Sequence, residues 1–157
     1  MANIQIELYA PGTHDYLIPA LVDLHVRAIE FDDALLRFHP PFTGAKRESM
    51  KLFWKERIEQ IVAGRRVMIM ALGKDTTDPT SSRTEEAVVA DNPIAGIVEL
   101  GLPESETGPF RADVEFFMVS PRHRNGGVGS RLMRELEQLA LAKQRTLLVS
   151  TIDKWRR

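Results

Sequence analysis

Cysteine is absent from this chain of 157 residues. Its absence excludes disulfide bonds, thiolate metal sites and a cysteine nucleophile. The formal net charge is −1, which gives no broad positive surface for nucleic acid or for an anionic membrane. No apolar run approaches the roughly 18 residues of a membrane span, and the first residues lack the basic and apolar segments of a secretion signal. We therefore expect a soluble, cytoplasmic protein that binds neither nucleic acid nor membranes.

Histidine is scarce as well, with four in the chain. None lies at a metal-ligand spacing from another, so we expect no metal site. Hydrophobic residues make up 43% of the chain and charged residues 27%, which is ordinary for a globular protein. The length suits a single domain over residues 1–157. The biased segment Lys74–Glu86 is rich in turn formers and charge, and it predicts a loop insertion over residues 74–91.

The pattern of apolar residues predicts a mixture of helices and strands. Alternation with a period of two indicates strands, and apolar residues three and four positions apart indicate amphipathic helices. Glycine and proline mark the ends of several of these segments. The expected strands are Ile4–Tyr9, Val67–Leu72, Ala87–Ala90, Ile94–Leu100, Ala112–Val119 and Thr146–Thr151, and the expected helices cover Leu17–Ile29, Met50–Val62 and Gly127–Gln144.

The most informative stretch joins an expected strand to an expected helix. The strand Val114–Val119 ends at Ser120-Pro121, and a short loop with three glycines follows over Arg124–Gly129. An amphipathic helix begins at once. A glycine-rich turn at a helix N-terminus is a phosphate-binding geometry, because the backbone can approach closely, its exposed N–H groups donate and the helix dipole favours negative charge.

Two known nucleotide-binding loops do not fit this stretch. The mononucleotide loop ends in Gly-Lys-Ser/Thr, whereas Gly129 is followed by Ser130 and Arg131. The dinucleotide fingerprint needs a third glycine three residues after the second, and this chain has Leu132 there. A mononucleotide-binding protein is therefore disfavoured.

The arrangement that does fit is Arg124-x-x-Gly127-x-Gly129 directly after a strand. It resembles the coenzyme A-binding motif of the GCN5-related N-acetyltransferase (GNAT) superfamily. The resemblance is closest over Asn92–Val149, where the chain looks like the tabtoxin-resistance-type acetyltransferases. It implies an α/β fold of the α+β kind, in which helices cover both faces of a mixed, mostly antiparallel sheet.

The resemblance also implies an activity. An acetyl-CoA-dependent N-acetyltransferase moves an acetyl group to the amine of a small molecule by direct attack on the thioester. The strand backbone would hold the pantetheine arm and polarise the thioester carbonyl, while the loop would hold the pyrophosphate and Arg124 would add charge. The implied coenzyme-binding residues are Phe117, Met118, Val119, Arg124, Asn125, Gly126, Gly127, Val128, Gly129 and Ser130.

The attacking amine must lose a proton, so the reaction needs a base. Asp113 and Glu115 lie two positions apart on one expected strand, which predicts that they share a face with Phe117. Relatives of this type carry an acidic residue at the position of Asp113, which makes it the first catalytic candidate, and Glu99 on the preceding strand is the second. The alternative for Asp113 is an ordinary carboxylate paired with Arg111.

The last part of the resemblance is incomplete. Superfamily members often use a tyrosine after the last strand as the general acid, and this chain has no tyrosine after the loop. Where the family continues with a helix and two strands, the chain reads Ser150–Arg157, so we expect a C-terminally truncated domain. An unpaired final strand would favour self-association, as in a homodimer. The alternative function is an acetyl-CoA-binding remnant or scaffold without turnover.

Overall fold

The computed structural model describes residues 3–33, 36–73 and 83–150. Short 3₁₀ turns at Asp15–Leu17 and Pro121–His123 lead toward the first and last helices. The other elements, in chain order, are β1 (Ile4–Leu8), α1 (Ile18–Asp32), α2 (Gly44–Val62), β2 (Arg66–Gly73), α3 (Glu85–Ala90), β3 (Ile94–Gly101), β4 (Arg111–Val119), α4 (Val128–Ala142) and β5 (Leu147–Ser150).

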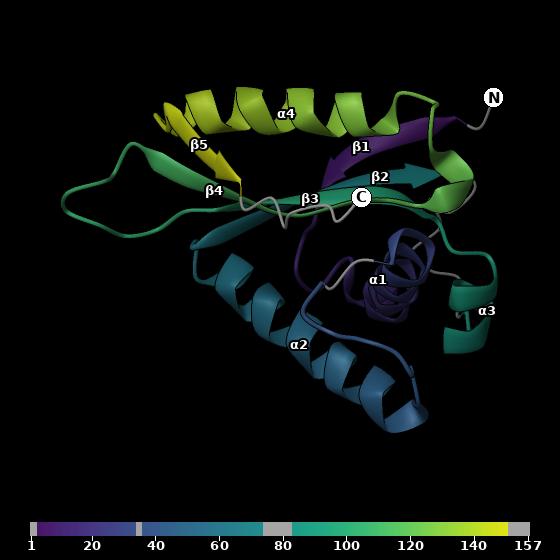
Figure 1. Ribbon diagram of the computed structural model, residues 1–157. Helices are drawn as coiled ribbons and strands as arrows, with labels where there is room; N and C mark the ends of the chain where they lie inside the picture. The colour runs from purple at the N-terminus through teal and green to yellow at the C-terminus, as the bar shows by residue number, and fades with distance from the viewer. Residues whose placement is uncertain (1–2, 34–35, 74–82, 151–157) are drawn as a thin grey trace.

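The strands form one sheet in the order β1-β2-β3-β4-β5. The first three pairs are antiparallel, and β4 pairs with β5 in parallel. Figure 1 shows α4 along one face of this sheet and α1, α2 and α3 on the other. The predicted fold class, a mixed and mostly antiparallel sheet with helices on both faces, is confirmed.

The two faces of the sheet carry separate hydrophobic cores. One core packs α1 and α2 against the sheet around Trp54 and Met50, and the other packs α4 around Leu132 and Leu136. Because β3 lies between both cores, all eight of its residues are buried. A strand covered on both faces is expected to be continuously apolar, so a buried Glu99 in β3 is an exception that needs charged partners.

The strand predicted at Ala87–Ala90 is wrong, because these residues lie in helix α3. Thr84 is the N-cap residue, and its hydroxyl accepts a hydrogen bond from the N–H of Ala87 at 3.3 Å. Glu85 and Glu86 in the first turn favour the same outcome through the helix dipole. The predicted insertion over residues 74–91 therefore contains a helix, and its part from 74 to 82 lies outside the described residues.

Strand β4 contains a bulge at Phe116, whose φ of 46° lies in the left-handed region. Across from it on β3, Ile97 faces Met118 and Glu99 faces Glu115. Three steps along β4 thus match two steps along β3, so β4 carries one extra residue. An extra residue moves every later side chain to the opposite face of the sheet.

The prediction that Asp113, Glu115 and Phe117 share one face is wrong because of this bulge. Glu115 lies on the side of α1 and α2, in the same layer as Phe116. Phe117 lies on the α4 side, where its ring approaches Gly129. A pattern of strict alternation cannot reveal a bulge, since the bulge depends on pairing with β3.

The outer edge of β4 is only partly covered by β5. The pairing extends from Arg111 to Val114, and beyond Val114 the described residues place no strand on that edge. Among the described residues, the backbone groups of Glu115–Val119 therefore lie at an open edge, next to the bulge. An edge of this kind can pair with an extended ligand.

Candidate active site

The glycine-rich loop surrounds a hollow of about 320 Å³ at the N-terminus of α4. Apart from His123, each lining residue was predicted from the sequence to bind the coenzyme. The lining residues are Val119, His123, Arg124, Asn125, Gly127, Val128, Gly129 and Ser130. The structure thus brings together a contiguous sequence motif and the end of β4 around one space.

The first turn of α4 offers hydrogen-bond donors to this hollow. The N–H of Arg131 donates to the carbonyl of Gly127 at 3.0 Å, and the N–H groups before it have no acceptor within the helix. The helix dipole adds partial positive charge at the same end. These features fit a phosphate group, which needs several donors and a positive potential.

The glycines of the loop are needed for different structural reasons. Gly127 has a φ of 80°, which disfavours any side chain, and Asn125 is also left-handed with a φ of 62°. A Cβ on Gly129 would lie 3.1 Å from the ring of Phe117, whereas one on Gly126 would meet nothing nearer than 3.6 Å. Backbone conformation therefore requires glycine at 127, and close packing favours it at 129.

Arg124 is held by an ion pair instead of lying free in the hollow. Its Nη1 and Nη2 donate to Oδ1 and Oδ2 of Asp32, at the end of α1, at 2.6 and 2.8 Å. Its Nε donates to the carbonyl of Val119 at 3.3 Å, and its Cζ lies 4.5 Å from the ring centroid of Phe31. Asp32 raises the pKa of Arg124 further above its usual range, so the guanidinium is fully charged.

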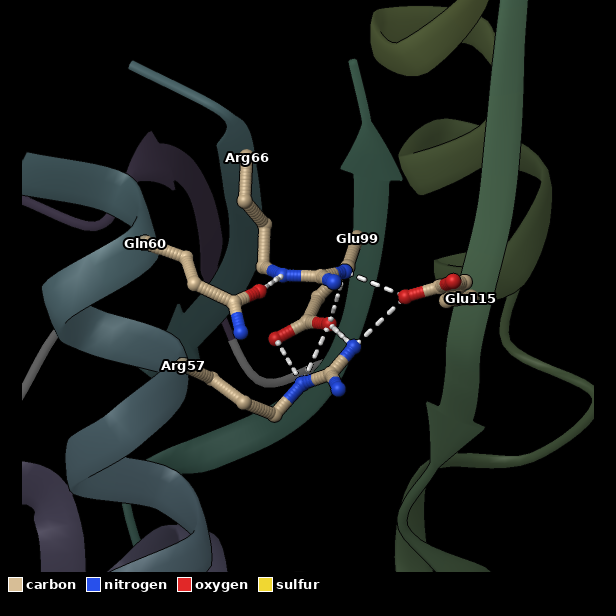
Figure 2. A network of polar contacts seen from close by, with 5 residues as sticks. All are labelled: Arg57, Gln60, Arg66, Glu99 and Glu115. Atoms are coloured by element: carbon tan, nitrogen blue, oxygen red, sulfur yellow. Dashed lines mark hydrogen bonds and ion pairs between the residues drawn. The ribbon is translucent and has the colours of Figure 1, made fainter. Parts of the chain in front are cut away.

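A second polar cluster lies beside the bulge of β4. Figure 2 shows Arg57 of α2 and Arg66 of β2 directed at two carboxylates, Glu99 of β3 and Glu115 of β4. Arg57 donates to Glu99 through Nε at 2.8 Å and to Glu115 through Nη2 at 2.7 Å. Arg66 donates to Glu99 through Nη1 at 3.0 Å, contacts Glu115 and donates through Nε to Gln60 at 2.9 Å. Two positive and two negative charges therefore balance within this cluster, between α2 and the sheet.

The two carboxylates of this cluster differ in exposure. Glu99 is 0% exposed, whereas the side chain of Glu115 is 37% exposed. Burial raises the pKa of Glu99, against the opposing hydrogen bonds and charge of Arg57 and Arg66. Partial burial acts in the same direction on Glu115, but the hydrogen bonds from both arginines outweigh it and lower its pKa. Glu115 is thus an ionised carboxylate that a solute can reach.

Asp113, the first catalytic candidate from the sequence, lies at the other end of β4. Its Oδ1 accepts a hydrogen bond from Nε of Arg111 at 2.9 Å, and Nη2 of Arg111 forms an ion pair with the same oxygen at 2.9 Å. It pairs with Gly101 on one side and Val149 on the other, so both edges of the strand are covered there. Asp113 lies six positions before Val119 at the end of β4, about 20 Å at strand geometry. Catalytic roles for Asp113 and Glu99 stay predictions.

An aromatic cluster adjoins Glu115 on the face of the sheet that α1 and α2 cover. Its rings belong to His25, Phe38, Phe53, Trp54 and Phe116. The Cζ of Arg57 lies 5.1 Å from the ring centroid of Phe53 and 4.4 Å from that of Phe116. Arg57 therefore joins the aromatic and ionic groups beside the bulge. Sequence reasoning missed this residue, although an arginine three positions after Trp54 on an apolar helix face was a usable signal.

Neither a metal-binding cluster of side chains nor a helix that could span a membrane is found in residues 3–33, 36–73 and 83–150. Within these ranges, no group of three or more histidine, cysteine, aspartate or glutamate side chains could hold a metal ion. No helix there has the length and apolar character needed to span a membrane.

The fold is α/β, and the place where a strand, a turn and a helix meet forms a hollow whose N–H donors suit an anion. The sequence matches the Acetyltransferase (GNAT) family over residues 47–154, which is more than half of the chain. The chain therefore belongs to the GNAT family of acetyltransferases. The finer likeness to the tabtoxin-resistance type stays a prediction.

Solved structures of other acetyltransferases share the fold. An acetyltransferase from Clostridium acetobutylicum, solved with acetyl-CoA, has 11% identity and a TM-score of 0.62, with 97% of this chain and 82% of that chain covered. A GNAT acetyltransferase from Staphylococcus aureus has 13% identity and a TM-score of 0.61, covering 98% and 89%. An aminoglycoside acetyltransferase from an uncultured soil metagenomic sample, in complex with sisomicin, has 16% identity and a TM-score of 0.57, covering 96% and 78%. No curated protein matches the sequence.

Proposed function

We propose that this chain is an acetyl-CoA-dependent N-acetyltransferase that acts on the amine of a small molecule. The observation that carries the proposal is the hollow at the N-terminus of α4, which adjoins the open edge of β4. The pyrophosphate of the coenzyme needs clustered N–H donors, and the extended pantetheine arm needs a strand edge. The acetyl-CoA complex of the Clostridium acetobutylicum relative supports the choice of cosubstrate.

Different residues of the chain bind different parts of the coenzyme. The backbone from Asn125 to Ser130 donates to the pyrophosphate, and Gly127 and Gly129 let the ligand come close. The open edge of β4 from Phe117 to Val119 bonds the arm, and an N–H on this edge polarises the thioester carbonyl. The side chain of Phe117 is 48% exposed beside Gly129, so it adds apolar contact to the same path.

Bound acetyl-CoA supplies the acetyl group: the amine nitrogen bonds to the carbonyl carbon, the carbon–sulfur bond breaks and the coenzyme leaves as its thiol. Glu115 attracts the ammonium form of the acceptor, which gives one proton to water and attacks as the neutral amine. Glu115 then takes a second proton, from the nitrogen that has bonded to the acyl carbon, and the departing sulfur takes one proton from water to become the thiol. A carboxylate of lowered pKa suffices, because a nitrogen bonded to the acyl carbon is far more acidic than the free ammonium. Glu99 is too deeply buried for this contact, so it supports Glu115 through the shared arginines.

The acceptor is proposed from the layer that surrounds Glu115. Aromatic faces and an ionised carboxylate suit an amine cation that also carries an apolar or sugar-like body. The sisomicin complex of the soil metagenomic relative supports a small-molecule amine.

The binding half of the proposal is tested with two matched glycine variants. Gly127 and Gly12 have φ angles of 80° and 83°, and a Cβ at either position would meet nothing within 4 Å. Gly127→Val and Gly12→Val thus strain the backbone alike, but Gly127 alone of the two lies in the hollow. We expect acetyl-CoA affinity, measured by calorimetry, to fall about tenfold or more in Gly127→Val and to stay unchanged in Gly12→Val. Equal affinities in both variants would contradict the site.

The catalytic half is tested by thiol release with a panel of small amines. We expect release above background in the wild type and a loss of about 100-fold or more in Glu115→Gln, with unchanged acetyl-CoA affinity. Asp113→Asn is the comparison that tests the first sequence candidate. Binding of acetyl-CoA without thiol release from any amine would instead support the reading of the chain as a binding protein without turnover.

A further inference from the structure

The arginine of the phosphate loop is bound to a carboxylate that comes from the opposite face of the sheet. Arg124 and Asp32 lie 92 positions apart in sequence and form a bidentate ion pair at 2.6 and 2.8 Å. Their side chains are 29% and 23% exposed. The pair therefore sits at the surface, at the rim of the hollow that Arg124 helps to line.

The position of Asp32 is unfavourable for its own helix. It is the last residue of α1, and no basic residue occurs in the last turn of that helix. A negative charge at a helix C-terminus is destabilising because it faces the negative end of the helix dipole. Helix stability therefore does not explain this carboxylate, whereas the pairing with Arg124 does.

A carboxylate and a phosphate compete for the same part of a guanidinium. Both are planar or tetrahedral oxyanions that accept two parallel N–H bonds from the fork of an arginine. In Arg124 this fork is filled by Asp32, while Nε stays bonded to the carbonyl of Val119 and the ring of Phe31 stacks on the group. The guanidinium is thus held beside the loop, with its two-nitrogen face already occupied by an internal anion.

We propose that Asp32 is an internal competitor that sets the affinity for the coenzyme, because it occupies the face of Arg124 that a coenzyme phosphate takes. This inference rests on the proposed function. Coenzyme binding exchanges one anion for another at Arg124. A partly exposed ion pair of this kind changes an equilibrium constant roughly two- to fivefold.

The test is a double-mutant cycle on the dissociation constant of acetyl-CoA, measured by calorimetry. The variants are Asp32→Asn, Arg124→Gln and the double variant, and all of them alter partly exposed side chains. We expect Asp32→Asn to tighten binding about two- to fivefold and Arg124→Gln to weaken it. In the Arg124→Gln background, Asp32→Asn should tighten binding no more than Asp33→Asn does in the wild type, because the competition requires the guanidinium.

Asp33→Asn is the matched control. Asp33 is the exposed neighbour, and no ion-pair partner for it occurs among the residues that the structure describes. It reports the general effect of removing one negative charge near an anionic ligand, so its effect should be smaller than that of Asp32→Asn. Weaker binding in Asp32→Asn, an equal gain in Asp33→Asn or the same gain without Arg124 would each overturn the competition. A wild type that binds no acetyl-CoA would reject the proposed function itself.

Discussion

Replacement of Arg57 by methionine is the sharpest test of how the fold holds the bulge of β4. Arg57 donates to both Glu99 and Glu115 and stacks on two aromatic rings. Its side chain is 11% exposed and that of Glu99 is 0% exposed. In Arg57→Met, Glu99 keeps a single guanidinium, that of Arg66, which it also shares with Glu115.

The expected loss of stability follows from the charge that is left behind. Removal of one partner from a buried ion pair costs about 3–5 kcal/mol, because the remaining charge is buried without full compensation. Native proteins of this size are stable by about 5–15 kcal/mol in total. We therefore expect a large fall of the urea midpoint in Arg57→Met, with an unchanged m-value. Arg111→Met, which removes an arginine whose side chain is 50% exposed and paired with the partly exposed Asp113, should cost less than about 1 kcal/mol.

The double variant Arg57→Met/Glu99→Met separates charge from packing. It removes one cation and one anion, leaves Arg66 and Glu115 as a pair, and fills the space with apolar side chains of similar volume. Such replacements are often neutral in stability, so the double variant should regain most of the loss. A double variant as unstable as the sum of the two single variants would refute the argument from an uncompensated charge.

Three further outcomes are expected. Burial lowers the pKa of His25 to about 4, against about 6.5 in an unfolded chain, so the unfolded chain takes the proton first as pH falls. The free energy of unfolding should thus decrease by about 3 kcal/mol as pH falls from 6.5 toward 4. In His25→Phe, urea titrations at different pH values should no longer show this decrease. Gly129→Ala should displace the ring of Phe117, which a new Cβ would approach to 3.1 Å, so the melting temperature should fall in Gly129→Ala and recover when Phe117→Leu is added. Thr84→Ala should cost about 1 kcal/mol in thermal unfolding through the lost cap of α3, and no change would show that Thr84 does not cap the helix.

Most of the fold was predictable because its signals are short in range. The helical periodicity of α4, the apolar run of β3 and the turn residues between them each arise within a few positions of the chain. The error at α3 also had a local cause, because the capping threonine and the two glutamates that follow were present in the sequence but were outweighed by the apolar residues after them. The family likeness supplied the type of sheet, mixed and mostly antiparallel with helices on both faces, which local patterns cannot provide.

The candidate site was predictable to the extent that it is contiguous. The loop from Arg124 to Ser130 combines a left-handed glycine with a helix start, and both properties belong to neighbouring residues. The roles of the carboxylates were harder to predict from the sequence, since they depend on solvent exposure and on ion-pair partners. Asp113 pairs with Arg111 two positions away, as the alternative interpretation had it, whereas Glu115 gains its position from arginines on α2 and β2.

The sequence by itself determined the geometry of the loop that we propose to bind an anion, because glycine conformation and the free N–H groups of a helix start depend on adjacent residues alone. The tertiary structure decided which face each side chain of β4 takes, since the bulge at Phe116 exists only through pairing with β3. It also decided the partner of Arg124, which lies 92 positions earlier in the chain. Charges so distant in sequence come into contact only when α1 and α4 pack against opposite faces of the same sheet. A local sequence pattern cannot predict that contact.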